Sequence, residues 1–240
     1  MKKSILNIGL LLTMLAVVNF TSCKGGDEPD KPFVIKAENV LGKTSDVATV
    51  KIVDWNYSKY PYTFDVIAQA PFVNKGFTLT LPAIVADKHL FSIDDEDMPE
   101  GVTISDKNAK IFGLEWLDAF DKDGEEIGYF MFGNSDNDGK IYFAVWMYTD
   151  RDVSIIGKGR DCYYDDYYDE EWCFEAELNV NLKKGWNVVY VVDDEINDIG
   201  LMTTQKPAGV TFEWYYESSD WYSLSTKTKS LKSKKSIFGR

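Results

Sequence analysis

Two cysteines, Cys162 and Cys173, enclose the most unusual segment of the chain. The residues between them include four tyrosines, one tryptophan and five acids, without a basic residue. In an oxidising compartment, two cysteines separated by ten residues can close a loop. A bridge needs Cα atoms roughly 4.4 to 6.8 Å apart, which paired strands can supply. The sequence therefore predicts a disulfide hairpin.

This segment has two interpretations. The favoured one is an acidic loop kept soluble by its charge, with tyrosines covering the neighbouring sheet. The other is a recognition loop, because tyrosine and tryptophan offer rigid stacking faces and carboxylates accept hydrogen bonds from sugar hydroxyls or bind calcium. On that second interpretation the candidate binding residues are Tyr163, Tyr164, Tyr167, Tyr168 and Trp172.

A second oxygen-rich segment places Asn134, Asp136 and Asp138 at alternate positions before Gly139. This spacing is similar to the start of an EF-hand loop, whose twelfth position is a bidentate glutamate. Here that position is Val145, inside a predicted strand. We therefore favour a plain Asp-Gly hairpin turn and expect no cofactor, with calcium at these residues as the alternative.

Few residues indicate catalysis. His89 is the only histidine, so a zinc site with several histidines is excluded and any His-based dyad or triad must include it. We expect it at a strand edge, without a catalytic role. Paired carboxylates can hydrolyse glycosides, but among 39 acidic residues close pairs arise by chance. No catalytic residue is predicted.

A phosphate-binding loop is also excluded. Five residues rather than four separate Gly133 from Gly139, and Ile141 stands where a serine or threonine should hold the metal. We expect no nucleotide ligand.

The start of the chain has the features of an export signal. Lys2 and Lys3 precede an apolar run at residues 5–18, which is typical of a signal peptide over residues 1–22. A membrane-spanning helix needs about 20 apolar residues, so this run is too short to remain as an anchor.

The sequence Phe20-Thr21-Ser22-Cys23 resembles the lipobox of bacterial lipoproteins, although Phe20 replaces the usual leucine. The resemblance implies cleavage before Cys23 and lipid on that cysteine, which leaves Cys162 and Cys173 as a pair. Residues 23–32 then form a flexible acidic tether.

This tether resembles the acidic export signal of lipoproteins of Bacteroidota. Residues 76–82 and 182–190 likewise resemble small β-rich lipoproteins of that group, which have no assigned activity. The resemblance implies an outer-membrane lipoprotein exposed at the cell surface, and no catalytic motif carries over.

Charge is unevenly distributed along the chain. The net charge is −13, but residues 222–240 carry six positive charges and no acid. Without this tail and the two signal-peptide lysines, residues 23–221 carry −21. Such a body repels nucleic acid and anionic lipid head groups. The basic end is expected to be a disordered tail, and the alternative is that it touches anionic polysaccharide or lipid or folds back on the body.

Apolar residues of the body recur with period two, which indicates strands. Turn residues at 121–124, 137–139 and 183–185 each separate two strand-like runs and predict hairpins. Residues 110–192 are therefore expected to form an antiparallel meander. The predicted strands are residues 48–55, 62–68, 76–82, 110–120, 127–132, 140–148, 153–156, 172–182, 186–192 and 209–216.

We predict an all-β body at residues 33–221, an antiparallel β-sandwich or jelly roll, with a closed calycin-like barrel as the alternative. The acidic run at residues 94–101 could divide it into two sub-domains.

Two functions remain. The preferred one is a lipid-anchored extracytoplasmic binding or structural protein without catalytic activity, recognising a glycan or a partner protein. The alternative is a polysaccharide hydrolase that uses paired carboxylates. A groove with two facing carboxylates and flanking aromatic residues would favour the hydrolase, and convex loops would favour the binding protein.

Overall fold

The computed structural model of the protein describes residues 32–56, 58, 60, 62–93, 98–135, 139–165, 170–194 and 196–219. The predicted signal peptide, residues 23–31 of the tether and the basic tail at 222–240 lie outside these residues. So do residues 94–97 of the predicted sub-domain division. Within the described ranges, no helix is long and apolar enough to cross a membrane.

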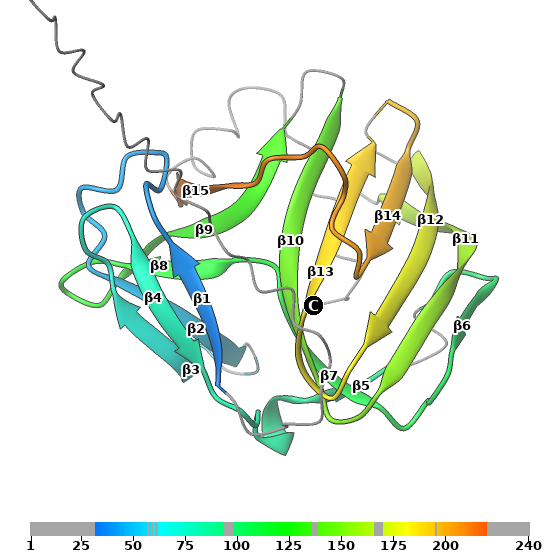
Figure 1. The fold of residues 1–240 in the computed structure, drawn as a ribbon, viewed down its shortest axis with the longest axis horizontal. Coiled ribbons are helices and arrows are strands. Elements are labelled where there is room, and N and C mark those ends of the chain that lie inside the picture. The colour runs from blue at the N-terminus through cyan, green and yellow to red at the C-terminus, as the bar shows by residue number, and fades with distance from the viewer. Residues whose placement is uncertain are drawn as a thin grey trace, which may run out of the picture.

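Strands make up nearly all of the regular structure (Figure 1). Their bounds are β1 (Phe33–Ala37), β2 (Thr49–Asn56), β3 (Thr63–Pro71), β4 (Phe77–Leu81), β5 (Phe91–Ser92), β6 (Val102–Ile104), β7 (Lys110–Leu114), β8 (Leu117–Phe120), β9 (Glu126–Ser135), β10 (Lys140–Thr149), β11 (Val153–Asp165), β12 (Glu170–Leu182), β13 (Gly185–Asp194), β14 (Ile199–Thr203) and β15 (Glu213–Ser218). One short 3-10 turn, η1 (Asp87–His89), precedes β5.

The strands form a two-stranded sheet, β1-β4, and a large sheet in the order β3-β2-β8-β9-β10-β13-β14-β12-β11-β6. Strand β15 pairs with β9, β7 with β10, and β5 with β7. All pairings between named strands are antiparallel except β12 with β14. The sheets do not close into a barrel, so the predicted all-β sandwich is confirmed and the closed calycin-like barrel is wrong.

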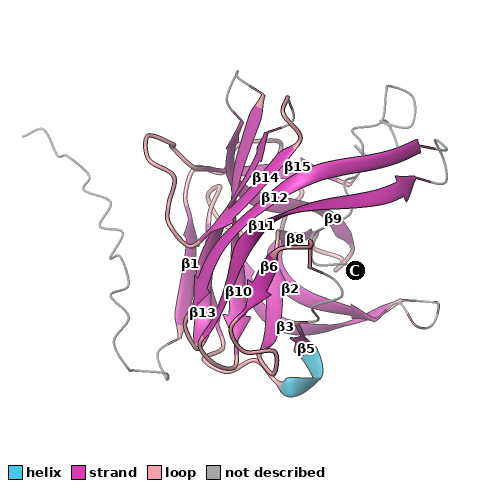
Figure 2. Cartoon of the chain, turned by 90° about the vertical axis from the view of Figure 1, so that its right-hand side faces the viewer, coloured by secondary structure: helices cyan, strands magenta, loops and turns pink. Residues whose placement is uncertain are grey.

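Two hydrophobic cores lie on opposite faces of the large sheet. Because side chains alternate along a strand, Trp146 and Tyr148 of β10 enter the first core while Val145 and Met147 enter the second. The first core lies between β1-β4 and the part of the large sheet around β2, β8 and β9. The second is enclosed where the sheet curls through β13, β14, β12 and β11 (Figure 2). Strand β10 is therefore covered on both faces.

The predicted meander is only partly correct. The turns at 121–124 and 137–139 join antiparallel neighbours, β8 with β9 and β9 with β10. The turn at 183–185 does not make a hairpin, because β14 lies between β12 and β13. It pairs parallel to β12 and antiparallel to β13. β14 thus supplies the backbone hydrogen-bond partners for the facing edges of β12 and β13. Local turn chemistry cannot indicate such a strand insertion.

Several strand bounds also differ from the prediction. The run expected at 110–120 is divided into β7 and β8, and β11 continues nine residues past Ile156. The strand expected at 209–216 begins only at Glu213. Short β1, β5, β6 and β14 had no expected counterpart, since two to five residues show too little alternation to be recognised.

Candidate functional site

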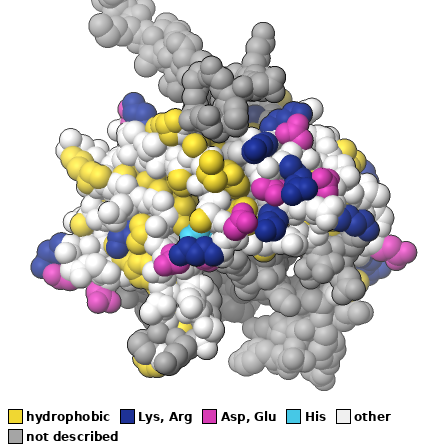
Figure 3. All heavy atoms as spheres, turned by 90° about the horizontal axis from the view of Figure 1, so that it is seen from below, with side chains coloured by type: hydrophobic (Ala, Val, Ile, Leu, Met, Phe, Trp, Pro, Cys, Tyr) yellow, Lys and Arg dark blue, Asp and Glu magenta, His cyan; other side chains and the backbone are white. Residues whose placement is uncertain are grey.

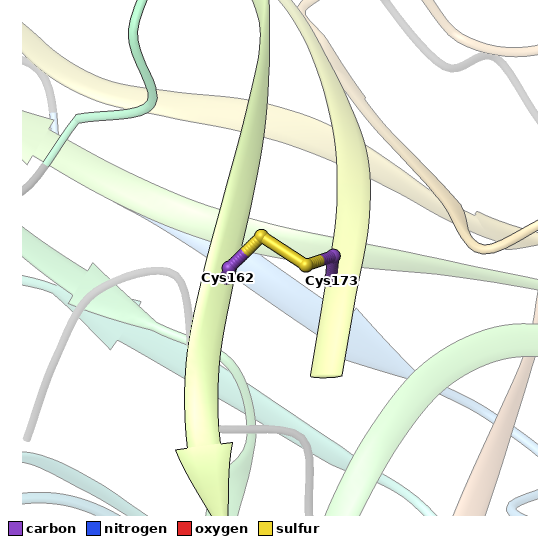
Figure 4. The surroundings of a disulfide bond; sticks show 2 residues. All are labelled: Cys162 and Cys173. Carbon is purple, nitrogen blue, oxygen red and sulfur yellow. A yellow bond between two sulfur atoms is a disulfide. The ribbon is translucent and has the colours of Figure 1, made fainter. Parts of the chain in front are cut away.

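Cys162 and Cys173 form the predicted disulfide. They are directly opposite each other in the β11-β12 register. The bridge joins the two neighbouring strands (Figure 4), with Cα atoms 4.0 Å apart, just below the expected range. Opposite positions on an antiparallel pair bring Cα atoms within about 4.5 to 5.5 Å. The prediction is confirmed, and the reason is the register of the strands.

The disulfide lies in a part of the β11-β12 hairpin that extends beyond the neighbouring strands of the sheet. Strand β6 pairs with β11 only as far as Gly157, and β14 pairs with β12 only from Glu175. Within the described part of the chain, the residue pairs from Asp161 opposite Phe174 to Asp165 opposite Glu170 therefore pair only with each other. We call residues 161–174 the arm. Figure 2 shows this end of β11 and β12 projecting away from the other strands.

The candidate binding residues all belong to this arm. The backbone places Tyr163 opposite Trp172 and Tyr164 opposite Glu171. Tyr167 and Tyr168 lie outside the described residues. Phe174, at the base of the arm, packs against the second core. We expected residues 161–174 to form a loop over the sheet. Where they are described, they instead form a two-stranded extension of the β11-β12 hairpin.

The candidate calcium site is only partly described. Asn134 lies in β9 opposite Tyr142 of β10, whereas Asp136 and Asp138 lie outside the described residues. The antiparallel pairing on both sides of this segment agrees with the favoured hairpin turn. Elsewhere in the described chain, no three His, Cys, Asp or Glu residues group closely enough to hold a metal ion. Calcium binding stays a prediction.

A groove of about 560 Å³ lies at the end of the β2-β3 ribbon, against η1. Its polar walls continue the core-facing row of β2: Val50 and Ile52 are buried, and Asp54 and Asn56 follow at the same spacing. Alternation places Asp54 on the face of Val50 and Ile52, although Val53 is also buried where the β2-β3 register shifts, and Asn56 is exposed at the strand end. The row therefore passes from apolar core into a polar groove. It is lined by Asp54, Trp55, Asn56, Thr63, Phe64, Asp65, Lys88 and His89.

Two side-chain hydrogen bonds hold η1 against the ribbon. His89 Nδ1 lies 2.8 Å from Asp54 Oδ2, and Lys88 Nζ donates to Asp65 Oδ2 at 2.6 Å. Asp54 of β2 and Asp65 of β3 are opposite each other in the strand register, so η1 makes one contact with each of the two strands. The hydrogen bond and charge of Lys88 lower the pKa of Asp65. His89 is buried in η1 rather than at a strand edge, which corrects our expectation.

On the face of η1, basic and acidic side chains lie beside one another (Figure 3). Beyond the Lys88 pair, Lys110 Nζ lies 3.7 Å from Asp87 Oδ2. Sequence reasoning missed this groove. The available signal was Asp54, which stands two residues after the apolar Ile52, where alternation expects another core-facing apolar residue.

A separate pair of carboxyl groups lies on β8 and β9. Asp118 is only 6% exposed, and desolvation followed by the charge of Glu126 raises its pKa to about 7. Burial also raises the pKa of Glu126. The carboxyl of Asp118 accepts hydrogen bonds from Trp116 and from the backbone of Val53. Asp118 does not line the groove.

Comparison with known proteins identifies no relative for this arrangement. No family model matches the chain, and no curated protein or solved structure is significantly similar to it. The geometry of the arm and the groove is therefore the basis for any functional proposal.

Proposed function

We propose that this chain is a lipid-anchored extracytoplasmic binding protein that presents the β11-β12 arm to a partner. The observation that carries the proposal is that the arm projects beyond both neighbouring strands and is closed by Cys162–Cys173. A two-stranded ribbon alone is marginally stable in water. The disulfide holds the ribbon together at the place where the rest of the sheet no longer does so.

The composition of the arm indicates the chemistry of its partner. Residues 161–174 contain six acidic residues and no basic one. Desolvating this many carboxylates is costly unless the partner supplies positive charge or hydrogen-bond donors. Tyrosine and tryptophan add contact area at a small cost in side-chain entropy. A basic protein surface fits best, and a glycan is the other outcome of the test.

Binding is better supported than glycoside hydrolysis. The groove holds two carboxylates and lies beside aromatic residues, the arrangement that would favour a hydrolase, but both carboxylates are engaged by basic side chains. A glycosidase needs a carboxylic acid whose raised pKa keeps it protonated. Lys88 lowers the pKa of Asp65, and Asp118, whose pKa is raised, lies outside the groove.

Membrane attachment is part of the proposal and rests on the sequence. The lipobox-like residues before Cys23 and the short apolar run support lipid attachment, and the acidic tether supports display at the cell surface. We expect Cys23→Ser to abolish labelling by a radioactive fatty acid and to leave an unprocessed or soluble precursor. Equal label on the variant and the parent would contradict the lipid anchor.

Loss of the disulfide should loosen the arm without unfolding the body. Closing a loop of this length contributes about 3 kcal/mol in the chain-entropy model, which corresponds to roughly 100-fold in an opening equilibrium. In the double variant Cys162→Ser, Cys173→Ser we expect hydrogen exchange of arm amides to rise by roughly that factor, and the circular dichroism of the body to stay unchanged. Two free thiols in the exported parent protein, measured by mass spectrometry, would contradict the premise.

Recognition by the arm is tested on intact cells. A photo-crosslinking amino acid in place of Tyr164 should capture a partner, and the same group in place of Ile84, which is 70% exposed on the body, should not. The double serine variant should lower the yield, and added salt should weaken capture by an acidic arm. Equal capture from both positions would exclude the arm as the recognition element.

A further inference from the structure

The groove beside η1 contains a buried imidazole with one nitrogen available. His89 is 8% exposed and lines the groove. Its Nδ1 is bound to Asp54, while its other ring nitrogen has no hydrogen-bond partner among the described residues. Buried polar atoms are nearly always satisfied by protein, water or ligand. This nitrogen therefore indicates a group that occupies the groove.

The charges of the groove indicate what kind of group this is. Each of its two carboxylates, Asp54 and Asp65, accepts a hydrogen bond from η1, one from His89 and one from Lys88. Every carboxylate and ammonium among these four side chains is therefore already engaged within the protein, which disfavours an ionic ligand. Asn56 adds an amide N–H donor, since its Oδ1 already accepts from the backbone N–H and hydroxyl of Ser58, and Thr63 adds a hydroxyl from the other strand.

We propose that this groove binds a neutral, hydroxyl-rich ligand, a single unit of a saccharide. A sugar hydroxyl both donates and accepts, so it can satisfy the available nitrogen of His89 together with the carboxylate, amide and hydroxyl groups around it. The volume of about 560 Å³ lies within the range of about 300 to 1,000 Å³ usual for small-ligand sites. Trp55 and Phe64 supply the apolar part of the lining. The site is separate from the arm, so neither proposal depends on the other.

The test uses the exported full-length chain and six soluble sugars. The methyl glycosides of glucose, galactose and mannose and N-acetylglucosamine are neutral, whereas glucuronate and glucosamine are charged. We expect at least one neutral sugar to bind saturably, with NMR shift changes at residues 54–56, 63–65 and 88–89. The two charged sugars should bind more weakly than their neutral counterparts.

Two variants separate ligand binding from folding. In His89→Asn the amide can keep the bond to Asp54 but has no atom at the position of the second ring nitrogen, so we expect at least a tenfold loss of affinity with little change in melting temperature. Asn56→Ala should also weaken binding, whereas Lys122→Ala, on the distant β8-β9 turn, should not. If no neutral sugar shifts these resonances, or if His89→Asn binds as tightly as the parent, the proposal is wrong. Preferred binding of a charged sugar would also overturn it.

Discussion

Replacing Trp214 with alanine is expected to lower the free energy of unfolding by about 3–5 kcal/mol, the usual cost of removing a large buried aromatic side chain. Trp214 of β15 is 6% exposed and stacks on Trp146 of β10, with ring centroids 5.5 Å apart. Its ring also meets Phe77 of β4 edge-on at 5.1 Å. Its indole Nε1 donates to the carbonyl oxygen of Lys36 in β1 at 3.2 Å. One side chain thus joins β15, the large sheet and the β1-β4 sheet.

Urea unfolding followed by far-ultraviolet circular dichroism measures this effect. Trp214→Phe should recover part of the loss, because it restores ring packing but not the bond to Lys36. Val73→Ala serves as the surface control, since Val73 is 57% exposed and should change stability by less than about 0.5 kcal/mol. An equal, small effect of the Trp214 and Val73 substitutions would show that the two sheets are not held together in this way.

Stability should fall as pH rises from about 4 to 7 because of Asp118. Burial first, and the charge of Glu126 second, raise the pKa of this carboxyl from 3.8 to about 7. In that interval the native state keeps a proton that the unfolded chain has already lost, so the free energy of unfolding decreases with pH, and the contribution is fully lost above pH 7. Two pKa units between pH 5 and pH 7 correspond to about 3 kcal/mol.

Asp118→Asn should remove this pH dependence, because asparagine resembles the protonated carboxyl. We expect the variant to be more stable than the parent at pH 8 by a few kcal/mol, and closer to it at pH 5, in urea unfolding at both values. Glu126→Gln should reduce the slope in part, since it removes the neighbouring charge. Asp123→Asn, in the exposed β8-β9 turn, is the matched control. An unchanged slope in Asp118→Asn would show that Asp118 is already ionised in the folded protein at pH 5 and that its pKa is not raised.

The arm and the groove differ in how they are stabilised. The arm lies beyond its neighbouring strands and is held by one covalent bond, so a partner can approach both edges of it. The groove lies against a hydrophobic core, and two side-chain hydrogen bonds from η1 hold its walls in place. In Figure 2 the arm projects to the upper right, whereas η1 lies at the bottom of the molecule. This separation is consistent with two independent binding events.

Local features of the sequence determined the strand content and the disulfide. Period-two alternation identified β2, β4 and β10 nearly to their bounds, because side chains of successive residues must face opposite sides of a strand. Cys162 and Cys173 were identifiable because a hairpin fixes its own register over a short distance. The pairings of β8 with β9 and of β9 with β10 were predicted correctly for the same reason.

Only the tertiary structure decided the order of the strands, the groove and the state of Asp118. β14 comes between β12 and β13 because packing brings distant segments together, which no turn residue encodes. His89 and Asp54 are 35 residues apart and meet only when η1 closes on the ribbon. The pKa of Asp118 depends on burial and on Glu126 across the strand pair. Alternation shows which residues share a face of a strand, whereas burial and charge depend on distances in space that are set when the whole sheet assembles.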